Sequence, residues 1–219
     1  MVDTCKFCDE EVEYHELVEC FTAAIDARDG YTAGHSQRVS DMAVMVAEAM
    51  GLPEKEIAKV HIAGHVHDVG KIGIPDSVLK KPGRLTDIEY EIIKTHTIIG
   101  DEILSKSHFF DELRPIVRGH HERFDGKGYP DGLAGNDIPV QARILAICDS
   151  IDAMSSDRCY RKKHDLDFCY DQIKSNAGTM YDPIIVEHVL KNWEKIICVL
   201  EGDGECTHED HDHKHKHLH

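Results

Sequence analysis

The chain has 219 residues, enough for one domain with a sizeable core and short tails. Its content of 41% hydrophobic and 30% charged residues is typical of a globular protein. A net charge of −16 argues against non-specific binding to duplex nucleic acid, which needs a basic face. A small anionic substrate is still compatible with this charge if local cations, including metal ions, dominate its pocket. No apolar run is long enough for a membrane span, so none is expected.

The ends of the chain differ in composition from its middle. The first residues lack the basic start and apolar stretch of a signal peptide. We expect an N-terminal tail over residues 1–10, with the pair Cys5 and Cys8, and one domain over residues 11–200. Residues 201–219 are acidic and rich in histidine, which predicts a disordered tail. The eight cysteines are widely spread, which favours a reducing, cytoplasmic setting.

The first half of the domain has helical periodicity throughout. Residues 11–28 are amphipathic and end before Gly30. Residues 32–50 place apolar side chains on one stripe, and Gly51 suits the helix end. Pro53 suits the first turn of a helix that continues to about Asp68. Thr86 and Glu89 have the spacing of a capping box, and the helix that they open is expected to carry Ile92, Ile93 and His96.

The second half contains the one long irregular stretch. A helix over residues 111–122 precedes residues 123–137, which hold four glycines and a proline. Irregular stretches of this length in a compact domain are usually functional or disordered. Helices over residues 139–155, 166–177 and 183–200 complete the domain. No strand is expected, so the fold class is all-α.

An adjacent His67-Asp68 pair indicates a metal centre. Imidazole and carboxylate at neighbouring positions suit a site that holds two cations side by side. Further candidate ligands recur at intervals along the chain: His35, His96, His120, His121 and Asp149. A lone histidine is more often structural, but seven candidates that mix histidine with aspartate on five predicted helices indicate a shared site. Asp68 is the natural bridging group, because a carboxylate has two oxygens. The residues therefore predict a dinuclear centre and phosphoester hydrolysis.

Lys71 follows this pair by one helical turn. It is either a solvated surface lysine or an acid that protonates a leaving alkoxide. His61 and His65 have i, i+4 spacing just upstream, and we expect them to be structural or to support the ligands.

These motifs resemble the HD-GYP family. The resemblance covers about residues 28–190, includes His67-Asp68-Val69-Gly70-Lys71, and is strengthened by Gly128-Tyr129-Pro130 in the loop after His120-His121. It implies a compact helical HD-domain phosphohydrolase fold with a long glycine-rich loop. Members of the family hydrolyse cyclic di-GMP to linear pGpG, or onward to GMP.

The resemblance also implies a ligand set. One metal ion would be held by His35, His67, Asp68 and Asp149, and the second by Asp68, His96, His120 and His121. Iron or manganese are the expected divalent metals. A hydroxide activated between them would attack phosphorus, and Lys71 would assist the departing 3′ oxygen.

Further residues are implied to contact the substrate. They are Asp29, Gly128, Tyr129, Pro130, Arg143, Arg158 and Arg161. The Gly-Tyr-Pro loop could alternatively dock GGDEF-domain proteins, and a homodimer is a further expectation. Two departures from the family pattern stand out. Tyr31 occupies the place where some members have a glutamate for a third metal ion, which favours a dinuclear centre with pGpG as product. Cys159 stands where relatives usually have proline.

Three other functions compete with cyclic di-GMP hydrolysis. The first is hydrolysis of another cyclic dinucleotide, such as cyclic GMP-AMP. The second is a catalytically weak or inactive module that binds cyclic dinucleotides or docks diguanylate cyclases; the complete ligand set argues against it. The third is a di-iron oxygenase. Lys71 and Arg158 argue against it, because these basic residues favour phosphate chemistry.

Overall fold

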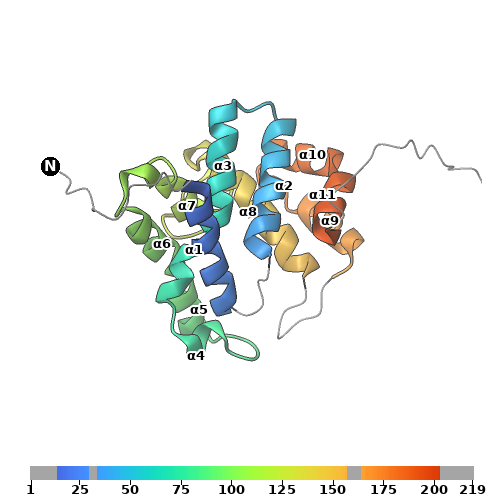
Figure 1. Cartoon of the computed structure of the whole chain (residues 1–219). Helices are drawn as coiled ribbons and strands as arrows, with labels where there is room; N and C mark the ends of the chain where they lie inside the picture. The colour runs from blue at the N-terminus through green and yellow to red at the C-terminus, as the bar shows by residue number, and fades with distance from the viewer. Residues whose placement is uncertain (1–13, 30–33, 157–163, 203–219) are drawn as a thin grey trace, which may run out of the picture.

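The part of the chain described by the computed structural model, residues 14–29, 34–156 and 164–202, is built from helices (Figure 1). Its α-helices are α1 (Tyr14–Asp29), α2 (His35–Ala49), α3 (Glu54–Val66), α4 (Asp76–Leu79), α5 (Asp87–Lys94), α6 (His96–Leu104), α7 (Arg114–Gly119), α8 (Val140–Ser155), α9 (Leu166–Ser175), α10 (Pro183–Lys191) and α11 (Trp193–Glu201). Short 3-10 turns are η1 (Val69–Gly73), η2 (His108–Phe110) and η3 (Gly135–Asp137). Within these residues the only β-type pairing is an isolated bridge between Ala177 and Tyr181. The all-α prediction is confirmed.

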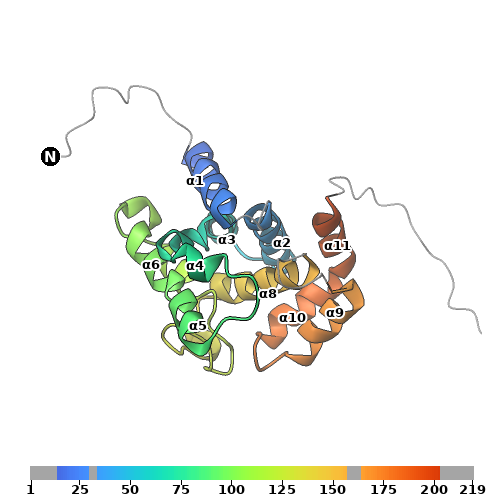
Figure 2. The same cartoon turned by 90° about the horizontal axis from the view of Figure 1, so that it is seen from below.

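Helix α8 lies at the centre of the fold. It packs against α2, α3, α7, α9 and α10. Its apolar residues are fully buried on several sides, among them Ile144, Leu145, Ile147 and Ile151. A helix that is apolar on most of its circumference has to be enclosed by others. Figure 2 shows α8 crossing the middle of the molecule, with α4–α6 towards one end and α9–α11 towards the other.

A very close backbone contact fixes η1 against α6. A Cβ built on Gly70 would lie 1.8 Å from the carbonyl oxygen of His96 and 2.5 Å from the amide nitrogen of Gly100. Only glycine fits there, because any side chain would overlap the backbone of α6. This contact brings the residues after His67-Asp68 against the first turn of the helix that begins with His96.

Three predicted helices differ from the observed ones. Thr95 ends α5, and its hydroxyl donates to the carbonyl of Ile92 at 2.6 Å, so His96 starts a new helix rather than continuing the old one. The predicted helix over residues 183–200 is divided at Asn192, whose side-chain amide donates to the carbonyl of His188 at 2.9 Å. The predicted helix over residues 111–122 is shorter, because Pro115 occupies the first turn of α7 and can donate no backbone hydrogen bond.

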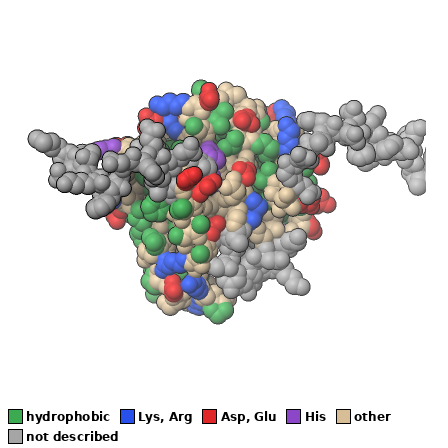
Figure 3. All heavy atoms as spheres, viewed as in Figure 1, with side chains coloured by type: hydrophobic (Ala, Val, Ile, Leu, Met, Phe, Trp, Pro, Cys, Tyr) green, Lys and Arg blue, Asp and Glu red, His purple; other side chains and the backbone are tan. Residues whose placement is uncertain are grey.

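The structure bears on the expectations about a membrane span, the surface charge, the cysteines and the tails. None of the described helices is long and apolar enough to span a membrane. On the face shown in Figure 3, acidic and basic side chains are interspersed. Cys148 and Cys169 are buried in the core and form no disulfide, whereas Cys198 is disulfide-bonded. The predicted tails lie outside the described residues, apart from residues 201 and 202, so the domain limits stay a prediction.

Candidate metal centre

All seven candidate ligands converge on one place in the fold. They form three overlapping groups, within each of which the ligand atoms lie within 4.8 Å of one another: His35 with His67 and Asp149, His96 with His120 and His121, and His67 with Asp68 and His120. The first two groups correspond to the two expected halves of a dinuclear site. The third joins them. That these side chains hold metal remains a prediction, but their convergence is a fact of the fold.

Asp68 lies between the two halves and offers one oxygen to each. Its Oδ2 is 3.6 Å from Nε2 of His35 and 3.3 Å from Nε2 of His67. Its Oδ1 is 3.5 Å from Nε2 of His96. A carboxylate placed in this way can bind two cations at once, one through each oxygen.

Backbone carbonyls set the tautomer of three histidines. Nδ1 of His67 donates to Gly64 at 2.7 Å, Nδ1 of His96 donates to Ile93 at 2.7 Å, and Nδ1 of His120 donates to Val117 at 2.6 Å. A carbonyl oxygen can only accept, so in the neutral ring Nε2 carries the lone pair.

The free lone pairs face each other rather than a donor. Nε2 of His96 lies 3.4 Å from Nε2 of His120, and Nε2 of His67 has no hydrogen-bond partner among the described residues. Leaving such a nitrogen buried and unsatisfied is costly. A cation between these nitrogens would satisfy them, so the donor set fits a metal.

His35 is oriented by a carboxylate that the sequence analysis missed. Asp152 lies one turn after Asp149 on α8 and is 1% exposed. Its Oδ2 accepts from Nδ1 of His35 at 2.7 Å, and its Oδ1 accepts from Nε of Arg38 at 2.6 Å. A carboxylate behind a histidine ligand fixes the ring and raises its basicity. The i, i+3 spacing from Asp149 was the signal available in the sequence.

The local charges act differently on the two halves of the cluster at neutral pH. Burial alone would raise the pKa of Asp68, but Lys71 and His67 hold it well below its ordinary value. Burial lowers the pKa of His120, and it lowers that of His121 to about 4, so both rings are neutral. In contrast, burial of His35 is outweighed by hydrogen bonds with Asp152 and Asp68, which raise its pKa to about 9. A metal ion bound there would displace a proton.

Lys71 projects from η1 into this cluster. Its Nζ lies 2.8 Å from Oδ2 of Asp68. The guanidinium of Arg28 on α1 holds the turn from behind: it donates to the carbonyls of Lys71 and Ile74, both at 2.5 Å, and is paired with Asp76 at 3.0 Å. Arg28 was not expected to have this role, because nothing in its local sequence indicates a contact 43 residues away.

The Gly-Tyr-Pro loop is tied to the second histidine group. A Cβ on Gly128 would lie 2.5 Å from Cα of Glu122, so the loop needs glycine to lie against the chain after His121. The buried Glu122 carboxylate accepts from the amides of Asp131 and Gly132 at 2.7 and 3.0 Å. Consequently the Tyr129 ring lies over His121, with 4.9 Å between centroids and 32° between planes.

The structure describes the side-chain contacts of only one of the other predicted substrate residues. Arg143 is ion-paired with Asp182 and donates to the side-chain oxygen of Asn136 at 3.0 Å. Asp29 is the last residue of α1, and its side chain lies outside the description. Arg158, Arg161, Tyr31 and Cys159 also lie outside the described residues. Their roles stay predictions.

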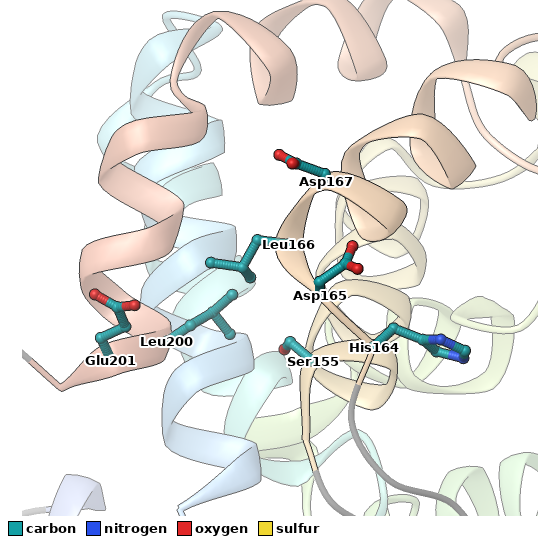
Figure 4. A pocket seen from close by; sticks show the side chains of 7 residues that line it. All are labelled: Ser155, His164, Asp165, Leu166, Asp167, Leu200 and Glu201. Atoms are coloured by element: carbon teal, nitrogen blue, oxygen red, sulfur yellow. The ribbon is translucent and has the colours of Figure 1, made fainter.

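A pocket of about 370 Å³ opens elsewhere, where α8, α9 and α11 meet (Figure 4). It is lined by Ser155, His164, Asp165, Leu166, Asp167, Leu200 and Glu201. None of the seven candidate ligands lines it. His164 packs on Phe168, and Asp165 caps α9 by accepting from the amide of Phe168. Structural contacts therefore account for His164 and Asp165.

Comparison with known proteins places the chain in a family. Residues 19–185 match the family model described as "HD domain". The chain is 42% identical over 183 residues to the cyclic di-GMP phosphodiesterase response regulator RpfG of Xanthomonas campestris, covering 83% of this chain and 48% of that protein. It is 40% identical over 206 residues to a cyclic di-GMP phosphodiesterase of Thermotoga maritima, covering 92% and 56%. The chain thus spans about half the length of these relatives.

A solved structure shares the fold. The cyclic GMP-AMP specific phosphodiesterase V-cGAP3 of Vibrio cholerae matches with a TM-score of 0.67 at 18% identity, covering 85% of this chain and 50% of that one. Because the family model matches residues 19–185 and the relatives are about 40% identical, the chain belongs to the HD domain family, and within it to the HD-GYP type that its motifs indicate.

Proposed function

We propose that this chain is a metal-dependent phosphodiesterase that hydrolyses cyclic di-GMP to linear pGpG. One observation carries the proposal: the two oxygens of Asp68 face two separate groups of histidine nitrogens, and Lys71 lies beside the same carboxylate. The names of the relatives from X. campestris and T. maritima support this choice of substrate.

The donor set supports two divalent ions, iron or manganese. His35, His67, Asp68 and Asp149 would hold one, and Asp68, His96, His120 and His121 the other. Mixed imidazole and carboxylate ligands suit these metals. Such ions, when bound, lower the pKa of water and neutralise charge on a phosphate.

The side chains of this protein have separate tasks in the reaction. The Lys71 ammonium carries the proton that a departing 3′ oxygen needs, and its ion pair with Asp68 at 2.8 Å directs it at the centre. Asp152 holds the His35 ring in place. The Tyr129 ring covers His121 on the loop side and excludes water from that ligand.

Cyclic GMP-AMP is the second candidate substrate, because V-cGAP3 shares the fold. Tyr31, which replaces a third-metal glutamate, favours pGpG over GMP as the end product. We further propose GGDEF-domain partners, a homodimer and a cytoplasmic location. These three proposals come from the family resemblance, and no contact among the described residues supports them.

Product analysis tests the proposal. The full chain is purified without oxygen, its metal content is measured, and it is incubated with cyclic di-GMP, cyclic GMP-AMP and mononucleotides. We expect two ions per chain and pGpG as the main product. Binding of cyclic di-GMP without turnover by the metal-loaded chain would contradict hydrolysis and support the inactive binding module.

A further inference from the structure

An ammonium group lies between two tyrosine rings beside the second histidine group. The Nζ of Lys94 is 5.2 Å from the ring centroid of Tyr90 and 5.6 Å from that of Tyr129. The Tyr129 ring in turn lies over His121. Lys94 is therefore one aromatic ring away from the candidate metal ligands.

These groups present a surface that a ligand can reach. Tyr90 and Lys94 are one turn apart on α5, and Tyr90 is 49% exposed. An exposed tyrosine ring next to a half-buried one offers a flat apolar face on which a nucleobase can stack. Neither side chain takes part in the metal cluster.

Among the described residues, Lys94 is also easier to recruit than Arg38 or Lys71. Arg38 is held by the buried Asp152, and Lys71 by the buried Asp68. Lys94 is paired instead with Glu91 at 2.5 Å, and their side chains are 25% and 68% exposed respectively. Because the carboxylate of this pair is exposed to solvent, the pair is weak and a phosphate can take its place. In a chain of net charge −16, a cyclic dinucleotide with two phosphates needs such a cation.

We propose that Tyr90 and Lys94, with the outer face of Tyr129, form a nucleotide subsite for the half of the substrate that is not cleaved. The base stacks on Tyr90, and Lys94 binds the adjoining phosphate. The inference rests on the proposed function and deepens it, because it separates recognition of a cyclic dinucleotide from cleavage at the metal centre.

The test compares two substrates in the metal-loaded full chain. Tyr90→Ala and Lys94→Met should each raise the KM for cyclic di-GMP about tenfold, since stacking on one ring or one phosphate contact is lost. The kcat and the metal content should not change. Hydrolysis of bis(p-nitrophenyl) phosphate, which has no second nucleotide half, should also be unchanged. Tyr90→Phe and Lys94→Arg keep the ring and the charge, and should keep most of the affinity.

A matched pair on another helix provides the control. Lys174 lies 5.9 Å from the ring of Tyr170 on α9, with the same i, i+4 spacing and a similar cation–ring contact. Lys174→Met should leave both activities unaltered. An unchanged KM in Tyr90→Ala and Lys94→Met would overturn the inference. Equal losses on both substrates, or a loss of metal, would overturn it as well, since they indicate that the cluster only supports the Gly-Tyr-Pro loop.

Failure of the proposed function gives a different result. In that case the wild-type chain would not hydrolyse cyclic di-GMP at all. The subsite is then tested by measuring equilibrium binding of cyclic di-GMP and cyclic GMP-AMP to the wild-type chain and the same variants. Weaker binding by Tyr90→Ala and Lys94→Met supports it, whereas binding that does not differ, or is absent in every form, contradicts it.

Discussion

Asp68 is the residue on which both halves of the centre depend, because each of its oxygens faces a different histidine group. We expect Asp68→Ala to lose metal and activity together. Removing a buried bridging carboxylate leaves histidine nitrogens without a shared counter-charge. Metal per chain and kcat, measured on the same preparation, check this. The exposed Asp41→Ala is the control, and full activity in Asp68→Ala would contradict a dinuclear centre.

Lys71 is expected to affect the rate without affecting metal content. Its ammonium is next to Asp68, but it can donate no lone pair to a cation while protonated. Loss of a general acid typically lowers kcat by about 10²–10⁴-fold, and Lys71→Ala should fall in this range. Elemental analysis should give the wild-type metal content, and the partly exposed Lys80→Ala should behave as wild type. A variant that keeps its kcat would show that Lys71 is only a surface cation.

The candidate ligands can be named from the sequence, but the residues that orient them cannot. His67 and Asp68 are adjacent in the chain, so their chemistry is visible without a structure. In contrast, Asp152 and Arg28 act over 117 and 43 residues of separation respectively, through contacts that only the packing of α8 on α2 and of α1 on η1 creates. A residue whose role is to hold another residue carries little local signal.

At the scale of single elements, the capping box of α5 provides a pH-dependent test. The Glu89 carboxylate accepts from the amide of Thr86 at 2.8 Å, and Lys81 with Thr86 lowers the pKa of Glu89 to about 2. Because the folded pKa lies below the ordinary one of 4.5, this carboxylate stabilises the fold above that pH and loses its effect as the pH falls towards 2.

Glu89→Gln should therefore unfold at lower urea concentration than wild type near neutral pH. The difference should shrink steadily below about pH 4.5. Urea titrations at several pH values measure it. Glu91→Gln on the same helix is the control, because Glu91 is not part of the cap. A difference that is constant with pH would mean that the charge of Glu89 has no stabilising role.

The turn η1 should depend on Arg28 for its geometry. Arg28→Ala removes two hydrogen bonds to the carbonyls of Lys71 and Ile74. A small displacement of Lys71 is expected to lower kcat about tenfold or more, with KM and metal content retained. Arg28→Lys can make one of the two hydrogen bonds, so its kcat should lie between those of the wild type and Arg28→Ala. If kcat stays at the wild-type value, the turn is held by Gly70 and α6 alone.

The predicted helix boundaries were wrong where a side chain competes with the helix backbone for hydrogen bonds to a carbonyl. Thr95 and Asn192 each bond a carbonyl three or four residues back, which favours a helix end although the apolar pattern continues. The break at Thr95 matters for the site, because it makes His96 the first residue of α6. Periodicity alone could not show this, since both helices keep the same apolar stripe in the sequence.

At the scale of the whole molecule, the candidate ligands come from segments between residues 35 and 149, and the last of them, Asp149, lies on the central helix α8. Ions bound there would join α2, the end of α3, α6, the end of α7 and α8. The fold would then be coupled to metal binding as a unit, rather than helix by helix.

Metal should accordingly raise the thermal stability of the chain. A ligand at about 100 times its Kd adds about 2.7 kcal/mol when it binds only the folded state, which corresponds to a rise in Tm of about 5–10 °C for a chain of this size. Calorimetry with manganese, before and after a chelator, measures it. Lys71→Ala should show the full rise and Asp68→Ala little of it. The 201–219 tail with its histidines is the same in Asp68→Ala, so comparison with that variant controls for any manganese bound there. An equal rise in Asp68→Ala would place the stabilising ions somewhere other than at this cluster.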